Sequence, residues 1–315
     1  MREILAVVTR HIIIGLLFFL PRERRLAIER RLRGKEEYRK LQAADWVLMS
    51  WAKSGRTWFR VMLSRFYQVK HGLPMNRMLE FDNLHSMNPA VPKVLFSHNN
   101  YMRAYLNDWD TLGHFRGKKV VMLVRDPRDV AVSQYFQWKY RMRPHKALLN
   151  NYPEKGSDTS IWEFVSSPNV GIPRIVDFFN GWARALPEQQ DILIIHYEKM
   201  RKDPQAVMRE VLAFVGTPGD DEQIAQAVEF ASLENMKKLE EKSVFRGSGV
   251  RVKAGDPNNP DSFKVRRGKV GGYRDYFDVE QVAEIDAMMA QLDPVFGYGS
   301  GDNDDSVSMA RGSAG

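Results

Sequence analysis

The stretch SWAKSGRTW, residues 50–58, decides the fold. It follows the short apolar run DWVLMS (residues 45–50) and precedes RTWFRVMLSRFYQVKHG (residues 56–72), whose apolar residues recur at helical spacing. A strand, a turn and a helix in this order present backbone N–H groups at a helix N-terminus, which is a ready anion site. The residues do not match the nucleoside-triphosphate-binding motif, G-x-x-x-x-G-K-[ST], because Lys53 precedes Gly55. We therefore expect a phosphate site of another kind.

The same pattern recurs along the chain. KVLFSH (93–98), KKVVMLVRDP (118–127) and DILIIHYEKM (191–200) are apolar runs with polar ends, which predict strands. Helical patterns follow the last two, as RDVAVSQYFQWKYR (128–141) and DPQAVMREVLAFVG (203–216). Strands that alternate with helices predict one α/β domain with a central parallel sheet flanked by helices. Ligands of such sheets bind at the carboxyl ends of the strands.

Composition narrows the classes of protein. The chain has 315 residues, of which 43% are hydrophobic and 27% charged, so a disordered chain is excluded. It has no cysteine, which excludes disulfides and thiolate zinc sites and fits a reducing compartment. The formal net charge of +8 favours anionic partners such as phosphates, acidic lipids or nucleic acid. Solubility alone would explain the same charge.

The two ends differ from the middle. An apolar run at residues 12–20 is shorter than the ~20 residues that span a bilayer, and the arginine-rich RERRLAIERRLRGK (22–35) follows it. We predict that residues 1–40 are helical and that residues 1–33 contact an anionic membrane face peripherally. Two alternatives remain for this N-terminal segment: a helix packed on the domain, or a helix that spans the membrane. The main domain is expected over residues 44–297, and the Gly/Ser/Asp-rich residues 298–315 are expected to be a disordered tail.

Five motifs, in order, resemble those of the sulfotransferases that use 3′-phosphoadenosine-5′-phosphosulfate (PAPS), especially the cytosolic type. They are WAKSGRTW (51–58), LVRDPRDVAVSQYF (123–136), IHYEKM (195–200), ASLENMKK (231–238) and RRGKVGGYRDYF (266–277). The resemblance implies an α/β domain with a P-loop-like phosphosulfate-binding turn. It also implies transfer of a sulfuryl group from PAPS to an acceptor hydroxyl, without a metal.

The resemblance also implies roles for particular residues. Lys53 would stabilise the leaving phosphate, His98 would act as general base, and Ser133 would contact Lys53 before substrate binds. Apart from the resemblance, residues 244–263 are expected to close over the bound nucleotide, because they immediately precede Arg266 and Arg267. The implied cofactor-binding set is Lys53, Ser54, Gly55, Arg56, Thr57, Trp58, Arg125, Ser133, Tyr197, Ser232, Leu233, Met236, Arg266, Arg267 and Gly268.

Arginine and histidine suit these roles chemically. The forked guanidinium of Arg125 matches a phosphate dianion better than an ammonium would, and the pKa of a histidine such as His98 lies near the operating pH of a general base. The chain departs from the family's pattern at Phe96, where many members have lysine, and at Leu233, where phenylalanine is common. By the resemblance, Phe96 removes an extra charge from the transition state, Leu233 changes the packing on adenine, and FSHNNY (96–101) changes the acceptor pocket. None of these departures removes a phosphate-binding residue.

The leading hypothesis is a cytoplasmic PAPS-dependent sulfotransferase, with peripheral contact to the membrane. Its acceptor would be a hydroxyl-bearing small molecule, glycolipid or sugar, and no nucleic-acid partner is expected. Two alternatives stay open. One is a nucleotide- or acidic-lipid-binding protein with a degenerate catalytic site. The other is a P-loop-like kinase, which the absent G-x-x-x-x-G-K-[ST] motif disfavours.

Overall fold

The computed structural model describes residues 2–108, 111–242, 256, 258–263 and 266–299. Of the predicted segments, most of residues 244–263 and nearly all of the tail at 298–315 lie outside this range.

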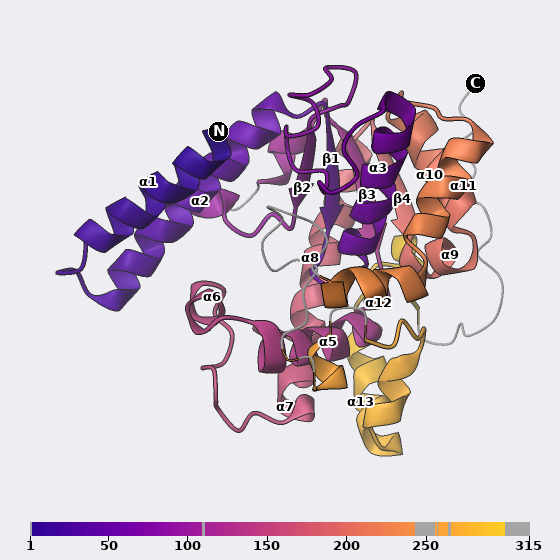
Figure 1. Cartoon of the computed structure of the whole chain (residues 1–315). Helices are drawn as coiled ribbons and strands as arrows, with labels where there is room; N and C mark the ends of the chain where they lie inside the picture. The colour runs from indigo at the N-terminus through magenta and orange to yellow at the C-terminus, as the bar shows by residue number, and fades with distance from the viewer. Residues whose placement is uncertain (1, 109–110, 243–255, 257, 264–265, 300–315) are drawn as a thin grey trace.

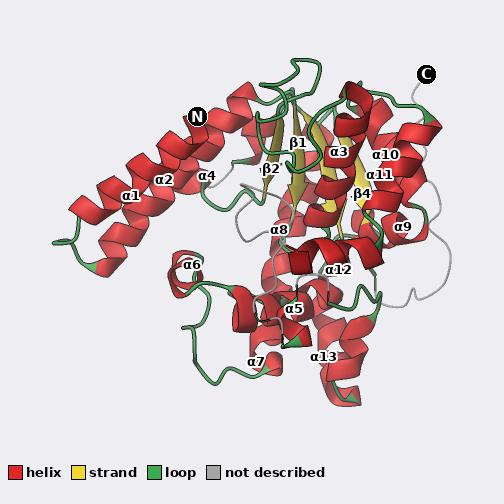
Figure 2. Ribbon diagram, in the orientation of Figure 1, coloured by secondary structure: helices red, strands yellow, loops and turns green. Residues whose placement is uncertain are grey.

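Four parallel strands form the centre of the molecule (Figures 1 and 2). They are β1 Trp46–Ser50, β2 Val94–Ser97, β3 Lys119–Val124 and β4 Ile192–His196, in the spatial order β2-β1-β3-β4. Strand β1 is buried along its whole length, which explains its unbroken apolar sequence. The predicted α/β fold with a parallel central sheet is thereby confirmed.

Helices cover both faces of the sheet. Their bounds are α1 Arg2–Leu16, α2 Arg22–Ala43, α3 Arg56–His71, α4 Met102–Leu106, α5 Pro127–Phe136, α6 Pro144–Leu149, α7 Ile161–Ser166, α8 Ile172–Ala185, α9 Tyr197–Lys202, α10 Pro204–Phe214, α11 Asp221–Phe230, α12 Leu233–Lys242 and α13 Val279–Met289. Alternate side chains of the strands enter two cores: Val47 belongs to a core that includes residues of α5, α7, α8 and α13, whereas Leu48 belongs to one that includes residues of α3, α10 and α11.

Three predicted elements differ at their ends. The run 118–127 was expected to be strand, but β3 ends at Val124 and α5 begins at Pro127. The run 191–200 was expected to be strand throughout, but β4 ends at His196 and α9 begins at Tyr197. The helix expected over 128–141 begins one residue earlier, because Asp126 caps it by accepting the N–H of Arg128 at 2.9 Å. Its last turn, Gln137–Arg141, is a π-helix, a form often found at functional sites.

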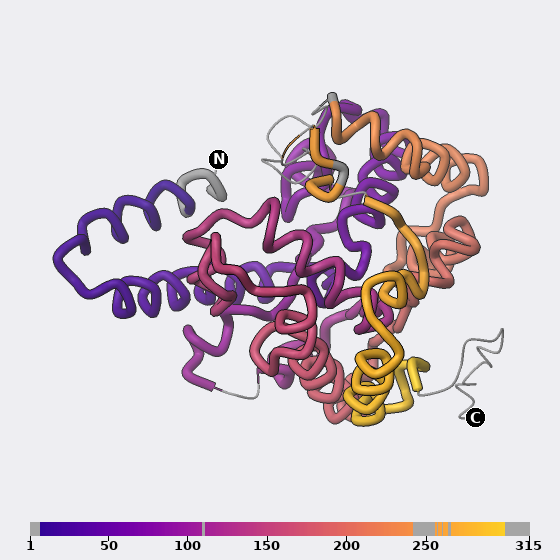
Figure 3. Tube along the Cα trace, turned by 90° about the horizontal axis from the view of Figure 1, so that it is seen from below, coloured from indigo at the N-terminus to yellow at the C-terminus, as the bar shows by residue number. Residues whose placement is uncertain are grey.

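Helices α1 and α2 form a hairpin that extends from the body of the molecule, as the tube in Figure 3 also shows. Helix α2 packs on α4, so this part of the N-terminal segment lies on the domain. The outer face of α1 and the turn after it are open: Ile12, Leu16, Phe18 and Phe19 are 57%, 67%, 76% and 69% exposed. Within the described residues, no helix has the length and apolar character needed to cross a bilayer.

Candidate active site

The turn between β1 and α3 shapes an anion site. Lys53 and Gly55 both adopt positive φ, 73° and 97°. Gly55 is required here, because a Cβ would lie 2.6 Å from the ring of Tyr197. Helix α3 starts from Gly55 without a side-chain cap, so its first N–H groups remain available to an anion. This is the strand–turn–helix arrangement that the sequence predicts.

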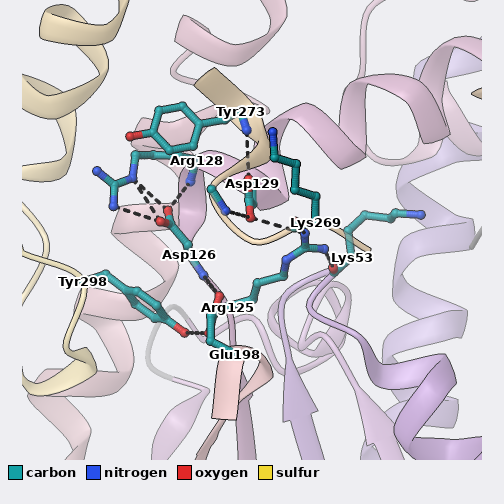
Figure 4. A network of polar contacts seen from close by, with 10 residues as sticks. Lys53, Arg125, Asp126, Arg128, Asp129, Glu198, Lys269, Tyr273 and Tyr298 are labelled. Carbon is teal, nitrogen blue, oxygen red and sulfur yellow. Dashed lines mark hydrogen bonds and ion pairs between the residues drawn. The ribbon is translucent and has the colours of Figure 1, made fainter. Parts of the chain in front are cut away.

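Arg125, directly after β3, joins this turn to the late glycine-rich segment (Figure 4). Its guanidinium donates to the carbonyl oxygen of Lys53 at 3.2 Å and to that of Lys269 at 3.4 Å. It also lies 4.3 Å from the ring centroid of Tyr197. The Nε of Arg125, a residue that lines the cavity, is buried without a partner among the described residues. Such an orphaned donor fits an anionic ligand.

Asp129 holds the late segment in place. Its buried carboxylate accepts the N–H of Gly271 at 2.9 Å and that of Tyr273 at 3.0 Å, and it lies 3.5 Å from Arg125. Burial raises the pKa of Asp129, and the charge of Arg125 opposes that rise. Asp129 was not identified from the sequence. The signal that could have found it is a carboxylate inside an arginine-rich anion site, because such a group accepts hydrogen bonds from donors of the protein itself.

Arg128 faces the other way, although it lies within the same motif. Its guanidinium pairs with Asp126 at 2.8 Å and with Asp286 at 3.0 Å, and it stacks on Tyr273. Figure 4 shows Arg128 and Arg125 directed to opposite sides of α5. Arg128 therefore stabilises the fold, and Arg125 alone of the two serves the cavity.

Lys53 lies in the turn and lines the cavity. Its Nζ lies 3.5 Å from the amide oxygen of Gln137. Burial, followed by the charges of Arg141 and Arg125, lowers the pKa of Lys53 to about 7. Arg141 is itself held by Glu240 at 2.7 Å and by the carbonyl of Ser262 at 2.8 Å. Gln137 and Arg141 come from the π-helical turn and were not identified from the sequence.

His98 follows β2 and is oriented by the backbone. Its Nδ1 lies 2.6 Å from the carbonyl oxygen of Ser50, which can only accept, so Nδ1 donates its proton. The Nε2 of neutral His98 is then the basic nitrogen. The preceding Ser97 donates to Glu37 of α2, and its hydroxyl accepts the N–H of Asn99 at 2.8 Å. These bonds fix the loop that carries His98.

One cavity of about 1590 Å³ brings most of the predicted residues together. Its lining includes Lys53, Gly55, Arg56, Thr57, Trp58, His98, Arg125, Ser133, Tyr197, Leu233, Met236, Arg266, Arg267 and Gly268.

Two predicted residues do not line this cavity. Ser54 is buried beneath the turn, and Ser232 is exposed, with its hydroxyl accepting the N–H of Asn235 at 3.3 Å. Trp58 donates to the carbonyl of Ala231 at 2.7 Å, which fixes its ring beside that of Tyr197. The site therefore contains separate cationic groups, an aromatic wall and a histidine. Among the described residues there is no group of three or more His, Asp or Glu side chains that could hold a metal ion.

Comparison with known proteins agrees with this geometry. A family model described as "Sulfotransferase domain" matches residues 43–293. Rat sulfotransferase 2A1 is 25% identical over 55% of this chain and 56% of its own length, so the match spans about half of that protein. Cytosolic sulfotransferase 17 of Arabidopsis thaliana is 24% identical over 81% of this chain and 76% of its own length.

Solved structures share the fold. Mouse sulfotransferase SULT7A1, complexed with PAP, aligns with a TM-score of 0.53 and 20% identity over 81% of this chain and 88% of that one. Retinol dehydratase, in complex with androsterone and the inactive cofactor PAP, aligns with a TM-score of 0.50 and 17% identity over 77% of this chain and 78% of that one. Because the family model covers most of the chain, the protein belongs to the sulfotransferase domain family.

Proposed function

We propose that this protein transfers a sulfuryl group from PAPS to an acceptor hydroxyl and releases adenosine 3′,5′-bisphosphate (PAP). The observation that carries the proposal is the convergence of three groups on one cavity: the turn at Lys53, the cluster around Arg125, and His98. A donor with a 5′-phosphosulfate and a separate 3′-phosphate requires two cationic sites, which this cavity supplies. The presence of PAP in both structural neighbours supports the same donor.

Each group has a chemical task in this proposal. The N–H groups at the start of α3 and the hydroxyl of Thr57 would hold the 5′-phosphate, with Arg125, Arg266 and Arg267 around the 3′-phosphate. Lys53, as the ammonium ion, would stabilise the charge that grows on the leaving phosphate, and such fixed charges are worth several kcal/mol in a transition state. His98 would take the acceptor proton on Nε2, since its Nδ1 donates to Ser50.

The rival functions fit less well. A kinase that uses a nucleoside triphosphate has no need for the arginines that line the cavity beyond the turn. A degenerate binding protein has no need for a histidine that is oriented through its Nδ1 and shares one cavity with a lysine of lowered pKa. Both features favour group transfer.

Release of PAP from PAPS in the presence of hydroxyl acceptors tests the proposal. We expect His98→Asn to lower the turnover by about 10²–10⁴-fold while PAP binding is kept, because the base acts only in the chemical step. His85→Asn is the matched control, since His85 lies outside the cavity and its Nδ1 donates to the carbonyl oxygen of Val91 at 2.8 Å. Unchanged turnover in His98→Asn would refute the assigned base, and absence of PAP binding in the wild type would refute the function.

The N-terminal hairpin supports a second part of the proposal, peripheral contact with an anionic membrane from the cytoplasmic side. Phe18 and Phe19 are exposed at the tip, and the arginines of RERR (22–25) follow immediately. Exposed aromatic side chains next to arginines favour insertion into an interface with acidic headgroups.

A further inference from the structure

The cavity continues past His98 into a part that the donor does not explain. This part is bounded by α2, α4 and α8, and its lining includes Arg30, Arg33, Arg103 and Arg174, together with a single carboxylate from the same helices, Asp177. An acceptor must enter here to bring its hydroxyl to His98. The charge of these walls therefore bears on the class of acceptor.

The close approach of α2 to α4 brings the arginines together. Gly34 makes it possible, because a Cβ at this position would collide with the carbonyl oxygen of Tyr101. Arg33, one residue earlier, lies with its guanidinium 5.7 Å from the ring centroid of Tyr101. Burial, followed by the charges of Arg174 and Arg30, lowers the pKa of Arg103, so these three cations are near neighbours.

The protein compensates this charge only in part. Arg174 pairs with Asp177 at 2.6 Å, and Arg33 pairs with Glu29 at 2.7 Å, a buried residue outside the cavity lining. Arg30, in contrast, donates to neutral oxygens: the carbonyl of Leu149 at 2.8 Å and the amide oxygen of Asn151 at 2.7 Å. The positive charge of Arg30 therefore has no carboxylate partner among the described residues.

Aromatic rings lie in the same part of the cavity. Trp51 and Phe178 contact each other with ring centroids 5.0 Å apart, and Trp51 is fixed by a 2.8 Å hydrogen bond to Gln134. Both line the cavity. Such rings can cover the apolar face of a ring in the acceptor, while the arginines meet an acidic group.

We infer that the acceptor is a hydroxylated acid, a molecule that carries a carboxylate or phosphate group in addition to the hydroxyl that receives the sulfuryl group. The inference rests on the proposed function, since it concerns the same cavity. A neutral phenol or steroid would leave the charge of Arg30 without an anionic partner, whereas an acidic group would form charge-assisted hydrogen bonds with it. Specificity for an acidic acceptor over a neutral one would come from the hydrogen bonds between its acidic group and the arginine side chain.

Calorimetric titration of the PAP-loaded protein tests the inference. The probes are 4-nitrophenyl β-D-glucoside, its carboxylate counterpart 4-nitrophenyl β-D-glucuronide, and the phosphate-bearing glucose 6-phosphate compared with glucose. We expect each acid to bind about tenfold or more tightly than its neutral partner, and the preference to shrink as salt is added. Comparing the carboxylate pair with the phosphate pair distinguishes the two acidic groups.

Variants connect the preference to the arginines. The variant Arg30→Gln should lose most of the preference for the acid and keep the melting shift caused by PAP. Arg209→Gln, an exposed arginine paired with Asp221 on the far helices α10 and α11, should keep both. If Arg30→Gln does not fold, the salt dependence of the preference in the wild type still decides.

Equal binding of acid and neutral partner, or no binding of either, by a protein that binds PAP would overturn this inference alone. A wild type that does not bind PAP would overturn the proposed function.

Discussion

The carboxylate of Asp129 accepts the backbone N–H of Tyr273 at 3.0 Å, across 144 residues of sequence. Together with the bond from Gly271, this contact sets the position of the segment that carries Arg266, Arg267 and Gly268. A cavity wall contributed by the last part of the domain is thus tied to the first turn of α5, next to Arg125.

Asp129→Ala should therefore weaken PAP binding although Asp129 itself is an anion. Loss of the carboxylate leaves the N–H groups of Gly271 and Tyr273 without a partner, at a cost of about 1–3 kcal/mol for a buried group left unsatisfied, and it removes the anion beside Arg125. Calorimetry should show a rise of about tenfold or more in the Kd of PAP. Asp221→Ala, at an exposed ion pair, is the control. Tighter PAP binding by Asp129→Ala would mean that Asp129 only repels the ligand.

PAP binding should take up protons near pH 8 through Lys53. Its pKa in the ligand-free protein is about 7, so most of the amine is neutral at pH 8. A bound phosphate favours the ammonium form and raises this pKa, so affinity should fall as the pH rises above about 7. Calorimetry in buffers of different ionisation enthalpy measures the uptake. Lys53→Met should abolish it, and an uptake that persists in this variant would assign the proton elsewhere.

Gly55→Ala should destabilise the protein more than Gly72→Ala. Both glycines have positive φ, 97° and 62°, but only at Gly55 would the new Cβ meet the ring of Tyr197. Backbone strain alone costs about 1–3 kcal/mol, and the clash adds to it. Chemical denaturation of the two variants separates the cost of backbone strain, which both variants have, from the cost of the clash, which only Gly55→Ala has. Equal losses of stability would show that Tyr197 moves aside freely.

The hairpin tip should bind vesicles that contain anionic phosphatidylglycerol and not vesicles of neutral phosphatidylcholine alone. Phe18→Ser/Phe19→Ser should reduce cosedimentation by about tenfold or more, because it removes two large apolar groups of about 1.5–3 kcal/mol each. Val279→Ser changes an apolar residue that is 82% exposed on α13 and serves as the control. Equal loss in both variants, or none in the double variant, would exclude the tip as the contact.

The sequence predicted the strands well, because each is a short apolar run that ends at a polar residue. The end of β4 at His196 was missed because Tyr197, the first residue of α9, is as apolar in character as the strand before it. The strand order could not be read from the sequence, since it depends on how the helices pack on each face.

Residues within recognisable motifs were located, and those that act through long-range contacts were not. Asp129 serves N–H groups that lie 142 and 144 residues away, and Arg141 is held by Glu240. Neither pairing leaves a local pattern. The arginines of α2 appeared in the sequence only as part of a basic helix, and their approach to the cavity depends on the packing at Gly34.

Thermal unfolding with PAP and with ADP at equal concentration tests the central claim most directly. The account predicts that PAP, at about 100 times its Kd, stabilises the wild type by about 2.7 kcal/mol, that ADP stabilises it far less, and that Arg125→Ala removes the difference. Equal shifts with PAP and ADP, or a preference for PAP that survives in Arg125→Ala, would contradict it.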